Sequence, residues 1–210
     1  MHLTGCARDG RGAERERALG RAICMKRIAL AAVLLAYPVA SVAGPIEDKA
    51  LVCAACHGSD GLPKDKTIPI LWGQNAAYLY LQLRDFEKGE RKSELMSPIA
   101  HDVVKDDALE LAEYFAAKEW PRTNAPSASA PLAATATAVN KSVPCTTCHM
   151  DQFQGDSTVP RLAGQQRDYL VKTLMDFRSR ARANNPAVSE LMSSLTPEQI
   201  QAIASYLAAL

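Results

Sequence analysis

The sequence lacks several patterns that would indicate common functions. It has no glycine-rich GxGxxG run, so a dinucleotide-binding domain is not expected. The net charge of the 210 residues is only +1, without the basic field that nucleic-acid binding requires. No segment gives a convincing strand pattern. These absences favour a helical protein that does not bind nucleic acid, and they direct attention to the cysteines and histidines.

The N-terminal part of the chain has the features of a secretory signal. Lys26 and Arg27 precede an apolar stretch over residues 28–39, which is too short to span a bilayer comfortably. The sequence Ser-Val-Ala, ending at Ala43, supplies the small residues that a signal peptidase reads. We therefore predict cleavage after Ala43 and export to the periplasm. An uncleaved membrane anchor is the alternative.

Residues 1–24 fit no signal peptide, because they are rich in Arg and Gly and have no apolar periodicity. We therefore expect translation to begin at Met25, so that residues 1–43 comprise a leader and a signal peptide. Those 43 residues hold 7 of the 24 basic and 3 of the 23 acidic residues, which leaves 17 basic and 20 acidic residues and a net charge of −3. The cysteines that remain are Cys53, Cys56, Cys145 and Cys148.

The remaining chain is duplicated. Three short segments occur twice in the same order: CxxCH, PxLxGQ and SELM. Their key residues are His57, Pro69 and Met96 in the first copy, and His149, Pro160 and Met192 in the second. A similar helical segment closes each copy, and the second of these begins with an N-cap and capping-box pattern at Thr196. Two tandem helical domains explain this repetition better than one large domain.

Composition suggests where the domains begin and end. We place the first domain at residues 44–122 and the second at residues 141–210. Residues 123–140 carry no charge and are dominated by Pro, Ala, Ser and Thr. Such a composition is typical of a linker, or in part of a weak Ala-rich helix.

Two cysteines followed by a histidine can serve several chemistries. Structural zinc usually needs four ligands, and each unit offers three. A thioredoxin-type CxxC expects a βαβ context, and a disulfide that closes so short a loop stabilises little. Covalent haem attachment uses all three residues, because the cysteines bond the haem vinyl groups and the histidine coordinates the iron. We therefore predict two covalent haem c groups, with His57 and His149 as iron ligands.

The recurring methionines Met96 and Met192 are the predicted sixth ligands of the two irons. A single methionine is usually a core residue, and we interpret Met175 in that way. His101 has no counterpart in the second copy, so we expect it at the surface or near a haem propionate. With both axial positions filled, each haem would carry one electron and perform no bond chemistry.

From about residue 45 to residue 210, these motifs resemble those of the dihaem cytochrome c4 family. The resemblance implies an all-α fold of two tandem cytochrome c-like domains, each around one covalently bound haem. It also implies that Pro69 and Pro160 place their carbonyl groups on the rings of the proximal histidines. The expected function is electron transfer between respiratory complexes, such as a quinol–cytochrome c oxidoreductase and a terminal oxidase. The sequence leaves open whether the protein associates loosely with the membrane.

The main alternative is a redox enzyme or one of its subunits. One form is the haem subunit of flavocytochrome c sulfide dehydrogenase, in which the flavin lies on a partner chain. Another is a dihaem peroxidase or a thiosulfate-oxidising enzyme with an open haem. A binding module that uses zinc or disulfides is a third class.

The two copies also differ in charge. Residues 44–124 have a net charge of −4, and residues 125–210 have a net charge of +1. Arg178, Arg180 and Arg182 form a basic cluster in the second copy. This cluster is either a solvated helix end or a surface that orients the protein between its redox partners.

The signal prediction can be checked on the protein isolated from its native host. We expect the mature chain to begin at Gly44 and the precursor to begin at Met25. N-terminal sequencing of both forms measures this directly. A precursor that begins at Met1, or a mature protein that keeps its apolar segment, would contradict the prediction.

Overall fold

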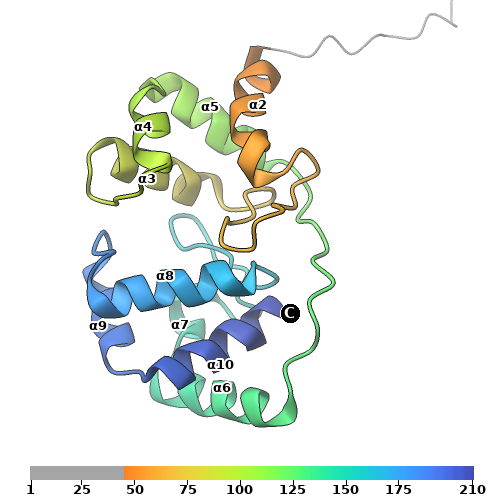
Figure 1. The fold of residues 1–210 in the computed structure, drawn as a ribbon, viewed down its shortest axis with the longest axis vertical. Helices are drawn as coiled ribbons and strands as arrows, with labels where there is room; N and C mark the ends of the chain where they lie inside the picture. Colours follow the sequence, from red (N-terminus) through yellow and green to blue (C-terminus); the bar gives the residue numbers. More distant parts are fainter. Residues whose placement is uncertain (1–44) are drawn as a thin grey trace, which may run out of the picture. The chain divides into compact units, whose positions relative to one another are not determined.

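The structure is a computed structural model that describes residues 45–210, so the predicted leader and signal peptide lie outside the described residues. The described chain is helical, as predicted, and its only strand-like feature is an isolated bridge between Asp156 and Val159. The helices are α2 (Pro45–His57), α3 (Ala76–Glu87), α4 (Met96–His101), α5 (Lys105–Ala116), α6 (Ala130–Ser142), α7 (Thr146–His149), α8 (Arg167–Ser179), α9 (Pro186–Ser193) and α10 (Pro197–Ala208) (Figure 1). No helix among these residues is long and apolar enough to cross a membrane.

The first half of the described chain contains α2 to α5. Helix α5 packs against both α3 and α2, and α4 packs on α3 (Figure 1). Apolar residues at helical spacing produce this packing, because Leu79 and Phe86 lie on one face of α3, and Leu111 and Phe115 lie on one face of α5. The small core of this half lies between the three longer helices.

The second half contains α6 to α10 and a larger core. Helix α10 packs against α6 and α8, and α9 packs against α8. The predicted cap of α10 is confirmed, since the Thr196 hydroxyl accepts from the Gln199 N–H and the Gln199 side chain accepts from the Thr196 N–H. Ile200, Ile203 and Leu207 of α10 are almost fully buried in this core.

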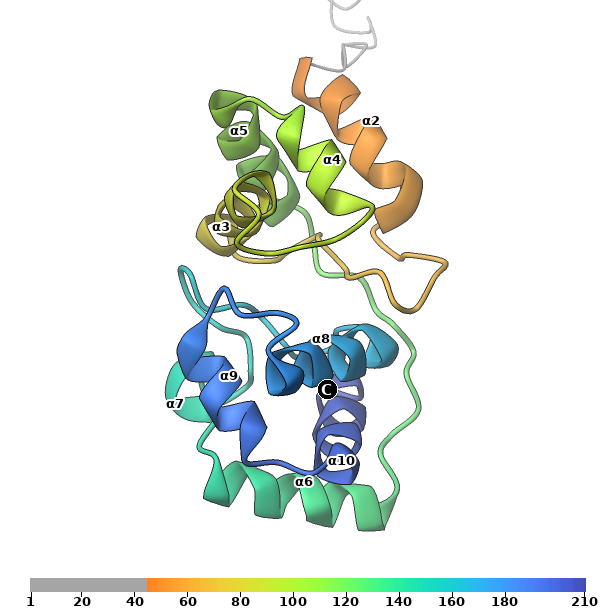
Figure 2. The ribbon, with the colours of Figure 1, turned by 60° about the vertical axis from the view of Figure 1, so that its left-hand side comes forward.

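Of the two interpretations of residues 123–140, a linker or in part an Ala-rich helix, the structure shows the second. Residues 130–142 form α6, and Ala136 and Val139 of this helix are each only 1% exposed. Figure 2 shows α6 lying against α10. Because alanine side chains are small, α6 can approach α10 closely without a wide apolar face. The sequence of residues 130–142 therefore lacks the spacing of large apolar residues that usually indicates a packed helix. The second half therefore begins near residue 130 and not at residue 141, and the non-helical connection is shorter than predicted.

The residue after each CxxCH motif has a positive φ angle. Gly58 has φ +88°, and a Cβ atom there would lie 2.5 Å from the carbonyl oxygen of Leu62. The equivalent residue in the second half is Met150, with φ 63° and ψ 168°. That combination is normally reserved for glycine and costs on the order of 1–3 kcal/mol in other residues. The second half therefore makes the same turn at a higher conformational cost.

Exchanging these residues should change stability in opposite directions. Met150→Gly should raise the free energy of unfolding by about 1 kcal/mol, because strain is relieved at some cost in unfolded-state entropy. Gly58→Ala should lower it by on the order of 1–3 kcal/mol. Denaturant unfolding of the haem-loaded protein, followed by circular dichroism, measures both changes. Met150→Ala is the matched control, because it shortens the side chain but keeps the Cβ atom. If Met150→Ala raised the free energy of unfolding as much as Met150→Gly, backbone strain would not be the cause of the gain.

Candidate haem sites

Both CxxCH motifs end a helix. His57 is the last residue of α2, and His149 is the last residue of α7. In each motif the first cysteine is half-buried and the second is exposed, and all four cysteines are free. One turn of helix places the two sulfurs and the imidazole on neighbouring positions, which is the local geometry that attachment of one planar group needs. Within residues 45–210, no group of three or more His, Cys, Asp or Glu side chains could hold a metal ion.

Each histidine ring is held by a proline carbonyl group. His57 Nδ1 lies 2.8 Å from the carbonyl oxygen of Pro69, and His149 Nδ1 lies 3.0 Å from that of Pro160. Because a carbonyl can only accept, Nδ1 carries the proton in both rings. Burial lowers the pKa of both histidines, against the opposing effect of these hydrogen bonds. Each ring is therefore neutral and presents the lone pair of Nε2 as a ligand.

The two predicted methionine ligands have different surroundings. Met192 lies in α9 and is buried in the second core, against which Cys145 also packs. Met96 is half-buried at the first position of α4 and is absent from the first core cluster. Met175 packs against the second core, as predicted. His101 ends α4 with an exposed side chain.

The donor set fits a haem group. Each half offers two thiols, a neutral imidazole held by its Nδ1 proton, and a thioether sulfur near the end of the repeat, which are the ligand types of a His/Met c-type haem. Cys53 and Cys56 with His57 and Met96 would hold the first group, and Cys145 and Cys148 with His149 and Met192 the second. When bound, such a group accepts and releases one electron at its iron.

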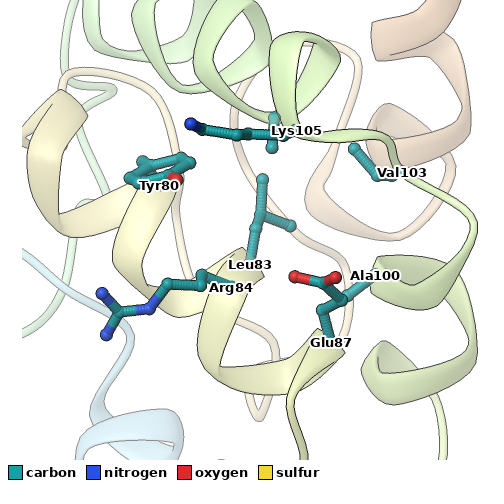
Figure 3. A pocket seen from close by; sticks show the side chains of 8 residues that line it. Tyr80, Leu83, Arg84, Glu87, Ala100, Val103 and Lys105 are labelled. Carbon is teal, nitrogen blue, oxygen red and sulfur yellow. The ribbon is translucent and has the colours of Figure 1, made fainter.

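One small, partly open cavity of the first half lies away from these motifs. It has a volume of about 20 Å³ and is bounded by side chains of α3 to α5 and the segment between α4 and α5, with Leu83 among them (Figure 3). A cavity of this size holds roughly one water molecule. It is therefore too small to hold a ligand larger than water.

A polar cluster that the sequence reasoning missed joins the two halves. Arg182 donates to the side chains of Tyr78 and Gln82 at 3.3 and 2.8 Å, and Arg91 donates to Gln82 and Tyr169 at 2.9 and 3.3 Å. Arg91 and Arg182 are equivalent residues of the repeat, as are Tyr78 and Tyr169. Their common spacing of 91 positions was the available signal.

The exposure predicted for the basic cluster of the second half is confirmed for Arg178 and Arg180 and wrong for Arg182. Arg182 is only 7% exposed and lies over the Phe177 ring at 4.3 Å, whereas Arg178 and Arg180 are exposed. Burial raises the pKa of Tyr78. At Tyr169 burial is outweighed by the guanidinium groups nearby, which lower the pKa to about 7. Arg182 is buried because its guanidinium group donates to Tyr78 and Gln82 in the other half.

The fold and the motifs define a c-type cytochrome, and comparison with known proteins agrees. A family model described as cytochrome c matches residues 134–210. Cytochrome c4 of Pseudomonas aeruginosa is 32% identical over 171 residues, which covers 76% of this chain and 84% of that protein. The crystal structure of reduced recombinant cytochrome c4 from Pseudomonas stutzeri superposes with a TM-score of 0.70 at 29% identity, covering 80% of this chain and all of that one.

The chain belongs to the cytochrome c4 family. It is therefore an electron-transfer cytochrome with covalently bound haem c. A further relative, the thiosulfate dehydrogenase electron acceptor of Stutzerimonas stutzeri, is 30% identical and covers 79% of this chain and 82% of that protein.

Removing one pair of cysteines should remove one haem. We expect Cys53→Ser/Cys56→Ser and Cys145→Ser/Cys148→Ser each to retain one covalent haem per chain, because each thiol pair serves its own group. Haem absorbance per chain after denaturation, together with the intact mass, measures this. The two double variants control for each other. Two haems retained in either variant would contradict the assignment.

Proposed function

We propose that this chain is a periplasmic dihaem cytochrome that carries electrons between components of a respiratory chain and delivers them to a terminal oxidase. The observation that supports this best is the duplicated contact between a buried proximal histidine and a proline carbonyl. Two equivalent sites on one chain suit a carrier that holds two electrons at once. Periplasmic residence is supported by the predicted signal peptide, because haem is attached to c-type cytochromes outside the bacterial cytoplasm.

In this proposal the residues of each half perform distinct tasks. The cysteine thiols would attach the haem, and each histidine would offer its Nε2 to the iron with its ring fixed by the proline carbonyl. Met96 and Met192 would each offer a thioether sulfur as the second protein ligand of an iron, which would exclude small ligands and favour the reduced state. A closed site changes little on electron transfer, so little reorganisation opposes the transfer.

A second candidate is an electron acceptor dedicated to one dehydrogenase. It is favoured by the similarity to a relative named as the electron acceptor of thiosulfate dehydrogenase. Both candidates need closed haems and differ only in the donor. The alternative of an enzyme subunit requires either an open haem or a partner chain that copurifies.

Carbon monoxide binding to the reduced, purified protein tests the closed sites. We expect no spectral change in the wild-type protein, because both irons keep a methionine. Met96→Ala and Met192→Ala should each open one haem to carbon monoxide. Met175→Ala is the matched control and should stay closed, because this residue packs in the core. Binding by the wild-type protein would contradict the carrier function and favour an enzyme.

A further inference from the structure

Two buried glutamines reach from each half into the other. Gln165 accepts from the Ile70 N–H at 2.9 Å and donates to the Ile70 carbonyl at 3.1 Å. Gln74 accepts from the Arg161 N–H at 2.8 Å and donates to the Arg161 carbonyl at 3.0 Å. Both glutamines are only 3% exposed. Each side chain therefore binds both polar groups of one residue in the opposite half.

The peptide group that each glutamine binds is the one that holds the proximal histidine. The Pro69 carbonyl and the Ile70 N–H belong to one planar peptide group. His57 Nδ1 donates to the oxygen of that group, while Gln165 accepts from its N–H. The second half repeats the arrangement with His149, Pro160, Arg161 and Gln74.

The orientation of each glutamine is itself fixed. The Gln165 side-chain oxygen also accepts from the Gln166 N–H at 2.8 Å, and the loop is attached to its own half by the Gly164 N–H, which donates to the Leu207 carbonyl at 2.8 Å. The first half has the same pair of contacts. The Asn75 N–H donates to the Gln74 side-chain oxygen, and the Gly73 N–H donates to the Phe115 carbonyl. If one half moves, its glutamine side chain therefore moves relative to the peptide group that it binds in the other half.

Hydrogen bonds in series polarise one another. A peptide whose N–H donates to a glutamine oxygen has a more negative carbonyl oxygen, and so accepts more strongly from the histidine Nδ1 proton. A stronger bond at Nδ1 makes the imidazole a better electron donor to the iron, which favours the oxidised state. Each glutamine should thus lower the reduction potential of the haem in the opposite half.

We propose that Gln74 and Gln165 are positioning residues that act across the interface between the halves. Gln165 strengthens the proximal hydrogen bond of His57, and Gln74 strengthens that of His149. The potential of each haem then depends on a glutamine that lies in the other half of the chain. This inference rests on the proposed dihaem function.

Replacing each glutamine by methionine, which is similar in shape but cannot form these hydrogen bonds, tests the inference. Gln165→Met should raise the midpoint potential of the haem at His57 and leave the other haem unchanged. Gln74→Met should do the reverse. A spectroelectrochemical titration gives the two potentials. NMR spectra of the methionine methyl groups in the oxidised protein assign each potential to its haem and report the change at the proximal ring.

Gln166→Met is the matched control, because Gln166 is buried and also binds the other half. Its side chain donates to the Pro63 carbonyl at 3.4 Å, which is not the peptide that holds His57. This variant should shift neither potential. The inference is overturned if the shift appears in the haem of the mutated half, appears equally in both haems, or is absent.

A methionine variant that fails to fold is replaced by Gln165→Asn or Gln74→Asn. These keep a polar amide in the interface but are one methylene too short to bind both groups. The midpoint potential of the haem in the opposite half should therefore rise by less than in the methionine variants. Failure of the proposed function is visible separately in the wild-type protein, as carbon monoxide binding or fewer than two haems. If the wild-type protein has two closed haems but the glutamine variants do not shift the potential of the opposite haem, only the inference is contradicted and the proposed function stands.

Discussion

One planar peptide group in each half, that between Pro69 and Ile70 and that between Pro160 and Arg161, is the constraint on which the haem sites depend. Its oxygen fixes the ring of the proximal histidine, and its N–H is bound by the opposite half. The glycine that follows attaches the loop to the C-terminal helix of the same half. The loop is thus held from three directions, so the imidazole orientation is determined by the cores of both halves together.

The two halves use different residues to make the same turns. Gly58 and Gly89 adopt left-handed φ angles in the first half, whereas Met150 and Arg180 do so in the second. The methionine of the repeat also begins α4 in the first half but lies near the end of α9 in the second. The second half has a larger core, because α6 packs on α10. The additional apolar burial stabilises the second half and offsets the conformational cost of its strained turns.

The sequence was sufficient for features that depend on local spacing. The CxxCH spacing predicted the two histidines, and the capping box at Thr196 predicted the start of α10. The proline partners Pro69 and Pro160 were implied by the resemblance to the cytochrome c4 family and not by spacing. It was insufficient where burial depends on distant residues. Residues 123–140 allowed either a linker or in part an Ala-rich helix, and composition could not decide between them, because the buried face of α6 is narrow. Arg182 looked solvated because its partner Tyr78 lies 104 positions away.

The crossed glutamines also bear on how such a duplicated protein can change during evolution. Neither half contains all the partners of its own proximal loop. Deletion of one copy would leave the N–H and carbonyl groups of Ile70 or Arg161 to hydrogen-bond with water. It would also expose the side-chain amide of Gln74 or Gln165, whose hydrogen-bond partners would be missing. Loss of either copy would therefore remove two hydrogen bonds from the proximal loop of the other. A substitution in the interface loop of one copy therefore also changes the hydrogen bonds of the loop in the other copy.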